Sequence, residues 1–471
     1  MTEVDLAVVG GTVVTGRGAE RGDVLIRGEQ IAAVAAPGER HDAARVIDAT
    51  GKLVLPGGVD VHTHFLVGFM SCRSVYDFFS GGVAALRGGT TTVVDFALQR
   101  RGRSLTDGLK HRRMQADARV AVDYGLHIVV TDVNEATLAE IPAVMREGVT
   151  SFKTYMTYEK DGLMLDDGAL LALLRVAGRE GALVGVHAEN EKIIAYETAR
   201  CLAKGEVAPR FHALTRPPIA EAEAVRRAIS LAEAAGAGIY IFHLALGREV
   251  PNIRAARRRG LPVFAETCPH YLTLDDSRYE RADGTLYVMS PPLRTAEDQK
   301  LLWAGLEDGT LAAVGSDDAS FSAEAKTASS GSFATTVNGV YGAEFRLPLI
   351  YTFGVETGRL TLPQLVRIWS EGPAQLFGLA PRKGTIAPGS DADLVVIDPE
   401  RRTRLTAQSH YGPVGYNIYP DVDLSGMPVC TVRRGAVAVE EGRYLGTAGD
   451  GRFIKRGKPD LASGIGVGAA P

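Results

Sequence analysis

The sequence predicts an α/β protein: a (β/α)8 TIM-like barrel with a small β-sandwich built from the N- and C-terminal segments. In the middle of the chain, short β-branched runs alternate with stretches of helical periodicity, and eight such units can be counted. Both ends are rich in short apolar runs broken by Gly or Asp. A doubly wound open sheet is the alternative, but eight units and polar residues at the strand ends favour a closed barrel.

The predicted elements divide the chain into four parts. Barrel strands are expected near residues 58–64, 90–96, 120–129, 149–154, 182–187, 238–243, 261–266 and 311–316, with helices at 104–117, 135–147, 167–180, 220–235, 249–259 and 296–307. We assign 1–56 to the N-terminal part of the sandwich, 57–380 to the barrel, 381–446 to the C-terminal part of the sandwich and 447–471 to a tail. The two β-rich ends are expected to form one unit, because chain termini often lie close together.

Composition excludes several classes of protein. The chain is 45% hydrophobic and 23% charged, as in ordinary soluble globular proteins. A net charge of −4 gives no reason to expect nucleic acid or an anionic membrane as a partner. No apolar run reaches the roughly 18 residues of a transmembrane helix. The four cysteines lack CxxC spacing, and no secretory signal opens the sequence, so we expect a cytoplasmic protein.

The first predicted barrel strand carries two histidines, His62 and His64, in VDVHTHF. Side chains alternate along a strand, so both imidazoles point to the face opposite Val59 and Val61. Neutral imidazole is the commonest metal ligand, and this pair is suited to form half of a metal site. Two hydrogen-bonded core histidines are the alternative reading of this motif alone.

The ends of other predicted barrel strands also carry side chains that can take part in a metal site. Lys153 lies near the end of the fourth strand, His187 and His243 end the fifth and sixth, and Asp317 ends the eighth. In a (β/α)8 barrel, catalytic residues sit at the C-terminal ends of the strands. Four histidines with a lysine and an aspartate in one layer indicate a metal centre better than separate core residues.

The lysine suggests how two ions are bridged. A buried lysine has a lowered pKa, and its neutral amine can add carbon dioxide to become a carbamate, N6-carboxylysine. The carbamate of Lys153 can bridge two divalent ions. The predicted ligands of one ion are His62, His64, Asp317 and the carbamate. The predicted ligands of the other ion are His187, His243 and the carbamate. Such ligands suit Zn(II) first, with Mn(II) or Co(II) possible.

The motifs together resemble a known family. HTHF, SFKTYM, VHAEN, IFHL, ETCPHYL, YVMSPPLR and GSDD, in this order, resemble the cyclic amidohydrolases, specifically the dihydropyrimidinase and hydantoinase branch. The resemblance runs from about residue 4 to about 455, and VHAEN and VMSPPLR favour this branch over dihydroorotase and allantoinase. It implies the same six metal ligands and a homo-oligomer, typically a tetramer.

The resemblance also implies residues that handle the substrate. Tyr158 matches the tyrosine whose hydroxyl steadies the oxyanion, and Ser290 and Asn338 match positions whose backbone groups hold the cyclic amide. Separately, four apolar or aromatic residues follow ligands of two strands and are expected to line the pocket entrance together: Leu66, Phe69, Met70 and Tyr155. An apolar entrance suits an uncharged ring or an apolar substituent.

Several positions depart from the family pattern. Asp318 stands where the family usually has His, Ala245 replaces a hydroxyl residue, and Glu344-Phe345-Arg346 replaces Glu-Asp-Arg. The loop LVGFMSCRS after His64 also differs. None is a predicted ligand. We expect all of them to lie where substrate sits, which leaves the identity of the substrate open.

The expected reaction is hydrolysis of the amide bond of a cyclic ureide or imide, a hydantoin or dihydropyrimidine, to an N-carbamoyl amino acid. Two metals lower the pKa of the water between them and supply hydroxide, which attacks the ring carbonyl. Tyr158 and one metal hold the oxyanion, and Asp317 passes the proton to the leaving nitrogen. The alternatives are an allantoinase- or dihydroorotase-like enzyme and a non-catalytic scaffold homologue. The six filled ligand positions argue against a scaffold, and the absence of arginine in HTHFLVGFM argues against dihydroorotate.

Overall fold

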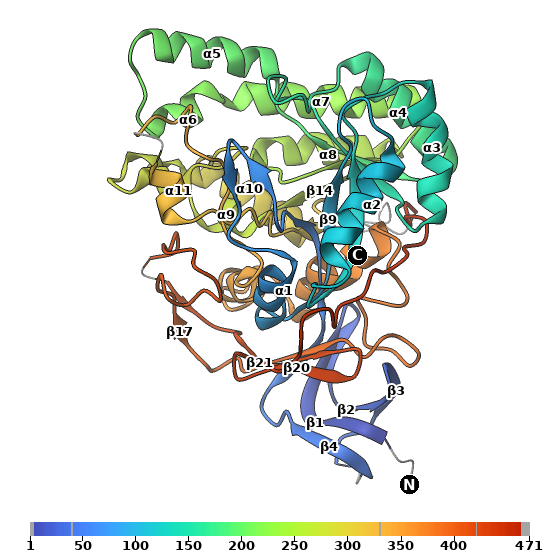
Figure 1. Cartoon of the computed structure of the whole chain (residues 1–471). Helices are drawn as coiled ribbons and strands as arrows, with labels where there is room; N and C mark the ends of the chain where they lie inside the picture. The colour runs from blue at the N-terminus through green and yellow to red at the C-terminus, as the bar shows by residue number, and fades with distance from the viewer. Residues whose placement is uncertain (1–3, 39–40, 329–330, 421, 463–471) are drawn as a thin grey trace.

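A parallel barrel forms the body of the molecule in the computed structural model, which describes residues 4–38, 41–328, 331–420 and 422–462 (Figure 1). Eight strands follow one another in the order β15-β14-β13-β12-β11-β10-β9-β6. They are β6 (Gly58–Thr63), β9 (Thr90–Leu98), β10 (Asp123–Val129), β11 (Ser151–Tyr155), β12 (Leu183–His187), β13 (Ile239–Ile241), β14 (Val263–Thr267) and β15 (Ala313–Val314). Each strand falls on one of the predicted runs, and the predicted fold class is confirmed.

The last barrel position closes onto the first through backbone contacts beyond the strand ends. Thr63 and Asp318 form a parallel bridge, and the His64 amide donates to the Asp318 carbonyl at 2.9 Å. The Ser316 hydroxyl donates to the His62 carbonyl at 3.1 Å. This closure brings the two histidines of β6 beside the residues that follow β15.

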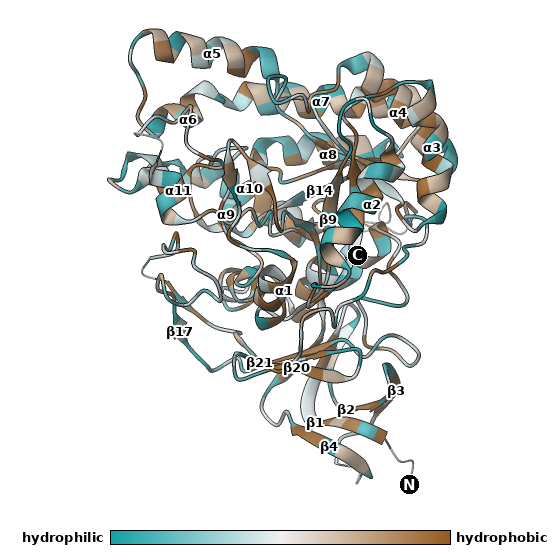
Figure 2. Ribbon diagram, viewed as in Figure 1, coloured by the Kyte–Doolittle hydropathy of each residue, from teal (hydrophilic) through white to brown (hydrophobic). Residues whose placement is uncertain are grey.

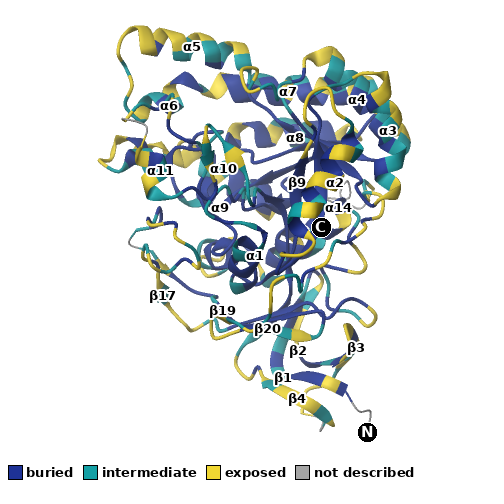
Figure 3. Ribbon diagram, viewed as in Figure 1, coloured by how far each residue is buried: buried dark blue, intermediate teal, exposed yellow. Residues whose placement is uncertain are grey.

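Helices surround the barrel. The six predicted ones are present as α2 (Leu105–Ala116), α3 (Glu135–Arg146), α4 (Asp167–Glu180), α7 (Pro218–Ala235), α8 (Val250–Arg258) and α10 (Ala296–Glu307). The remaining helices are α1 (Phe78–Arg87), α5 (Glu191–Ala203), α6 (Arg210–Thr215), α9 (Pro269–Thr273), α11 (Ala323–Thr327), α12 (Arg346–Ile350), α13 (Leu362–Val366) and α14 (Gly372–Leu376). Figure 3 shows the barrel strands buried beneath this layer, whereas α5 is largely exposed.

Helix α1 was missed because its FFSGGV start reads as a turn. Asp77 caps it, since its carboxylate accepts from the backbone amides of Phe79 and Ser80 in a capping box. Gly81 is needed for packing, because a Cβ there would lie 2.5 Å from the ring of Phe65. Tertiary contact therefore outweighs the low helix propensity of glycine.

Strands from both ends of the chain join in one nine-stranded sheet below the barrel (Figure 1). The path is β21-β20-β19-β16-β5-β1-β2-β3, with β4 paired to β1. These strands are β1 (Val4–Thr15), β2 (Gly18–Arg27), β3 (Gln30–Ala35), β4 (Ala43–Asp48), β5 (Leu53–Pro56), β16 (Leu394–Ile397), β19 (Pro428–Arg433), β20 (Ala436–Glu440) and β21 (Arg443–Tyr444). Two short hairpins stand apart, β7 (Gly68–Phe69) with β8 (Cys72–Arg73) and β17 (Thr403–Arg404) with β18 (Asp423–Leu424).

Pairing of β5 with β16 connects the two ends, as in the partners Pro56 and Leu394. The sheet has its own apolar core, which includes Val8, Ile26 and Val432. Figure 2 shows hydrophobic residues along the barrel strands as well, around β9 and β14. The exact domain boundaries at residues 57, 381 and 447 stay predictions.

A buried ionic cluster connects the barrel to the sheet. Lys383 Nζ lies 2.6 Å from Asp123 of β10, 2.9 Å from Asp391 and 2.7 Å from Asp393. Arg434 also pairs with Asp123. Breaking a buried pair by removing one partner typically costs about 3–5 kcal/mol. Loss of one member alone should therefore destabilise the junction between the barrel and the sheet.

The described part of the predicted tail, residues 447–462, packs on the N-terminal end of the barrel, opposite the predicted site, and the rest of the predicted tail lies outside the described residues. The Tyr124 amide donates to the Arg452 carbonyl at 2.9 Å. Arg456 is buried and donates to the Leu126 carbonyl and, at 2.9 Å, to Ser151 Oγ. None of the helices in the described ranges is both long enough and apolar enough to pass through a membrane.

Candidate metal and substrate site

A cavity of about 580 Å³ opens at the C-terminal ends of the barrel strands. Five of the six predicted metal ligands line it: His64, Lys153, His187, His243 and Asp317. The sixth, His62, is fully buried and contacts Asp317. The structure therefore gathers all six residues at one end of the barrel, although they come from positions far apart in the sequence.

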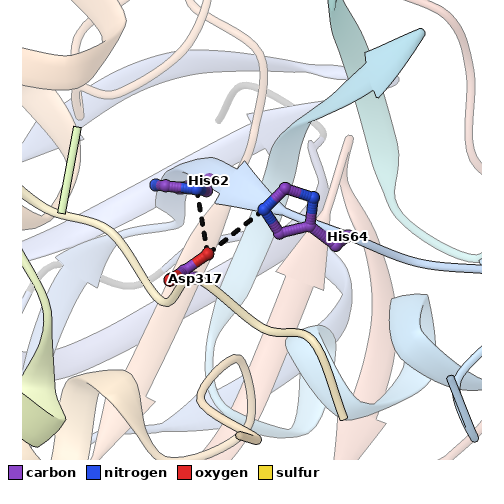
Figure 4. A group of neighbouring side chains, drawn as sticks. All are labelled: His62, His64 and Asp317. Atoms are coloured by element: carbon purple, nitrogen blue, oxygen red, sulfur yellow. Dashed lines mark ion pairs between the residues drawn. The ribbon is translucent and has the colours of Figure 1, made fainter. Parts of the chain in front are cut away.

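His62, His64 and Asp317 form a close group of possible metal ligands (Figure 4). Asp317 Oδ1 lies 2.9 Å from His62 Nε2 and 3.1 Å from His64 Nε2, and the ligand atoms of the three residues lie within 4.8 Å of one another. Burial favours the neutral carboxyl, but the adjacent His62 outweighs it and holds the pKa of Asp317 well below its usual range. Asp317 also has a positive φ of 49°, a conformation uncommon outside glycine that clusters at functional sites.

His62 shows that this group attracts positive charge. Burial lowers the pKa of His62, yet the negative charges of Asp317 and Glu266 together raise it to about 9. The same two carboxylates would favour a divalent cation in place of the proton. The pKa of His64 is lowered, with burial the largest cause, so its imidazole is neutral and available as a ligand.

Lys153 in β11 has surroundings that favour a neutral amine. Its side chain is buried, and its Nζ has no hydrogen-bond partner among the described residues. Nζ lies 3.8 Å from the centroid of the Phe242 ring and 5.1 Å from that of Tyr155. Burial lowers the pKa of Lys153 to about 7. A neutral, unpartnered amine of this kind is the form that reacts with carbon dioxide.

His187 and His243 both line the cavity and contact each other edge to face, with ring centroids 4.4 Å apart. Burial lowers the pKa of both, so both imidazoles are neutral. His187 Nε2 lies 2.6 Å from Glu189 Oε2, and the same oxygen accepts from Arg216 at 2.6 Å. His243 Nδ1 is buried and has no hydrogen-bond partner in the part of the chain that the structure describes.

These observations fit a site for divalent cations. Lys153 Nζ and His243 Nδ1 are buried polar atoms without partners, which is costly unless a ligand satisfies them. Neutral imidazoles and an ionised carboxylate are the donor set that zinc and similar ions prefer. The group of three and the neighbouring pair His187–His243 contain the histidines and the aspartate of the two predicted ligand sets, and their assignment to two ions stays a prediction.

Sequence reasoning missed the groups that orient these ligands. Glu266, the penultimate residue of β14, contacts His62 Nδ1 through one carboxylate oxygen. Its other oxygen accepts from the Tyr240 hydroxyl at 3.0 Å. Glu189 acts in the same way on His187. Carboxylates that hold the far nitrogen of a metal-binding histidine fix the ring and raise its basicity. The signal was an acidic residue at an apolar strand end, in VFAET, that no other role explains.

Two residues just beyond β14, one of them in α9, form a second group of possible metal ligands with Asp317. Cys268 and His270 bring their ligand atoms within 4.8 Å of Asp317. Both residues are buried, and neither lines the cavity. Because Asp317 belongs to both groups, the two cannot use it independently.

Tyr158 lies at the wall of the cavity with its ring centroid 5.3 Å from that of His187. It has a positive φ of 64°. Burial raises the pKa of Tyr158 to about 12, partly opposed by Arg216 and the Ser290 hydroxyl. The phenol is therefore protonated at neutral pH and can donate a hydrogen bond to an oxyanion.

Ser290 and Asn338 line the same cavity. Apart from the contact of Ser290 with Tyr158, Ser290 Oγ and Asn338 Oδ1 have no hydrogen-bond partner among the described residues, although both atoms are buried. Polar atoms that are buried without partners at a cavity wall are suited to bind a polar ligand.

All four residues predicted for the entrance line the cavity: Leu66, Phe69, Met70 and Tyr155. The β7–β8 hairpin carries Phe69, whose ring centroid lies 5.6 Å from that of Tyr158. The hairpin thus brings apolar side chains over the predicted oxyanion donor.

The expectation that every departure from the family pattern faces the substrate is wrong. Asp318, Ala245 and residues 344–346 do not line the cavity. The Asp318 carboxylate instead accepts from the backbone amides of Gly342 and Ala343, both at 2.9 Å. Of the departures, only the loop after His64 lines the cavity. Asp318 instead fixes the backbone that follows it, while its neighbour Asp317 faces the cavity.

Comparison with known proteins agrees with this geometry. The model of the amidohydrolase family matches residues 53–437. The chain belongs to the amidohydrolase family. It is 42% identical over 95% of its length to D-hydantoinase of Geobacillus stearothermophilus, of which 96% is covered, and 41% identical over 95% of its length to D-phenylhydantoinase of Escherichia coli (strain K12), of which 97% is covered.

Among solved structures, this amidohydrolase resembles dihydropyrimidinase from Brevibacillus agri NCHU1002 with a TM-score of 0.94 and 41% identity. The match covers 96% of this chain and 99% of the other. The resemblance to the dihydropyrimidinase and hydantoinase branch is thereby confirmed.

Proposed function

We propose that this amidohydrolase hydrolyses the ring amide of hydantoins and related cyclic ureides to give N-carbamoyl amino acids. The observation that carries the proposal is the joint lining of one cavity by the metal-ligating groups, the protonated Tyr158, its neighbour Ser290 and Asn338, whose Oδ1 has no partner among the described residues. The relatives described above are named for hydantoin and dihydropyrimidine substrates.

The proposed cofactor is a pair of divalent metal ions. The family is metal-dependent, and the described residues include suitable ligand groups. We assign His62, His64 and Asp317 to one ion, His187 and His243 to the other, and carbamylated Lys153 to both. Zn(II) is the first candidate, with Mn(II) or Co(II) possible. Ions held there would polarise the ring carbonyl and acidify water.

The side chains supply the rest of the chemistry. Ionised Asp317 accepts the proton of the attacking water and delivers it to the leaving ring nitrogen. Protonated Tyr158 donates a hydrogen bond to the oxygen that becomes negative during attack. Ser290 and Asn338 hold the cyclic amide in place. Leu66, Phe69 and Tyr155 contact the ring and its substituent, and they limit the access of bulk water.

A second candidate substrate class follows from two arginines. Arg73 and Arg100 line the cavity, and neither forms an ion pair with a described residue. Such groups can pair with an anionic substituent or with the carboxylate of dihydroorotate. They keep a dihydroorotase-like or allantoinase-like activity as the alternative, whereas the filled ligand positions disfavour a non-catalytic scaffold.

A substrate panel tests the proposal. Hydantoin, 5-substituted hydantoins, dihydrouracil, allantoin and dihydroorotate are offered to the metal-loaded enzyme, and the products are identified by mass. We expect N-carbamoyl amino acids from hydantoins. The absence of turnover of every hydantoin and dihydropyrimidine would refute the proposal.

The assembly and the location of the protein are also proposals. The resemblance supports a homotetramer, which light scattering of the purified chain can test. The cytoplasmic location predicted from the cysteine pattern can be tested by cell fractionation. No nucleic-acid partner is expected at this net charge.

A further inference from the structure

The two polar groups proposed to hold the cyclic amide come from different segments. Ser290 follows the 3₁₀ turn Gly284–Tyr287, and Asn338 lies on the segment that leads to Val340. The segments touch directly through the Gly339 amide, which donates to the Val288 carbonyl at 3.2 Å. Their separation determines whether both groups can reach one ring.

Lys326 of α11 binds both segments at once. Its side chain is fully buried, and Nζ donates to the carbonyls of Val288 at 2.8 Å, Val337 at 3.1 Å and Gly339 at 2.8 Å. All three carbonyl oxygens lie within hydrogen-bond distance of Nζ. One carbonyl lies two residues before Ser290, and the other two flank Asn338 on either side.

Other side chains anchor the Ser290 segment by itself. His212 Nε2 lies 2.7 Å from the Met289 carbonyl, and the Tyr271 hydroxyl donates to the Pro291 carbonyl at 2.7 Å. The Tyr279 hydroxyl accepts from the Leu293 amide at 2.9 Å. These bonds fix this segment against the barrel, but they do not reach Asn338. Lys326 supplies the side-chain connection between the two.

We propose that Lys326 is a positioning residue that sets the distance between Ser290 and Asn338 and so fits the site to a cyclic amide. Lys326 does not line the cavity and contacts none of the proposed metal ligands. It therefore acts on substrate binding through the backbone and not on the metal centre. The inference rests on the proposed function, because it assigns Ser290 and Asn338 to the substrate.

Loss of Lys326 is expected to raise KM and to leave kcat nearly unchanged. Ser290 and Asn338 hold the amide in both the ground state and the transition state, and loss of such uniform binding raises KM with little change in kcat. Lys326→Met keeps the length and the apolar stem but removes all three donors. With one or two substrate hydrogen bonds weakened, KM for hydantoin should rise about 10- to 100-fold. Metal content should stay at the wild-type value.

Lys383→Met is the matched control. Lys383 is also fully buried and also binds three partners, but these lie at the junction of barrel and sheet. Its loss should lower Tm and leave KM unchanged in the folded, metal-loaded fraction. Should Lys326→Met not yield folded protein, Lys326→Gln, which keeps two N–H donors, should show a smaller rise of KM in the same direction.

Three measurements on the wild type and the variants test the role of Lys326. They are KM and kcat for hydantoin, metal per chain by elemental analysis, and Tm. A raised KM with normal kcat and metal supports the inference. An unchanged KM in folded Lys326→Met, or a fall in kcat together with metal loss, would overturn it. If the wild-type enzyme turns over no cyclic ureide, the proposed function fails instead, and calorimetric affinity for a five-membered cyclic imide then compares the same variants.

Discussion

His62 Nε2 lies 2.9 Å from Asp317 Oδ1, so the first and the last barrel positions meet at the candidate metal centre. This contact depends on barrel closure, because the backbone of Asp318 pairs with that of Thr63 and His64. An open sheet would leave the two residues at opposite edges. Closure of the fold is therefore a requirement of the proposed chemistry.

Replacement of the proposed bridging lysine should empty the metal site. Lys153→Ala removes the only group assigned to both ions, so most bound metal and nearly all hydantoin turnover should be lost. Added short carboxylic acids should restore part of both, since a carboxylate can substitute for the carbamate. Lys300→Ala, at an exposed lysine on α10, is the control. Wild-type metal content and turnover in Lys153→Ala would refute the carbamate.

Removal of the tyrosine hydroxyl should slow catalysis and leave the metals in place. Tyr158→Phe deletes one oxyanion donor, and loss of a comparable donor in other enzymes lowers kcat by about 10²–10³. Steady-state kinetics and elemental analysis measure the two effects. Tyr155→Phe, which keeps the neighbouring ring, should retain kcat near wild type. A change confined to KM would assign Tyr158 to binding alone.

The carboxylate that orients His62 should affect metal affinity. Glu266→Gln keeps the shape of the side chain but removes its charge. Substitution of residues that hydrogen-bond to a metal ligand typically lowers metal affinity or activity by about 10- to 100-fold. Competition with a chelator measures the affinity directly. Tyr240→Phe, which removes only a hydrogen bond to the other oxygen of Glu266, should have the smaller effect. Equal metal affinity in wild type and Glu266→Gln would show that Glu266 is not needed for orientation.

The apolar entrance should determine which substituents are accepted. We expect neutral cyclic ureides to exceed dihydroorotate by at least about 100-fold in kcat/KM, or roughly 2.7 kcal/mol of transition-state discrimination. Phe69→Ala should change the ranking among 5-substituted hydantoins while metal content stays normal. If dihydroorotate is the best substrate, Arg73 and Arg100 become the explanation, and Arg100→Ala should then reduce its turnover selectively.

Much of this arrangement could be predicted from sequence because it follows local patterns. Apolar runs located the eight strands, and polar residues at their ends located His62, Lys153 and His243 at the cavity. The position of Asp318 could not be predicted, since its outward direction depends on the amides of Gly342 and Ala343. The bonds of Lys326 likewise join segments whose proximity only the folded chain reveals.

Counting metal ions against activity tests the central claim most directly. The chain is stripped with a chelator, supplied with bicarbonate, and titrated with Zn(II) while hydantoin hydrolysis and bound metal are measured on the same samples. The account predicts that activity rises until two ions are bound per chain and then stops rising. Full activity with one ion or none per chain would contradict it.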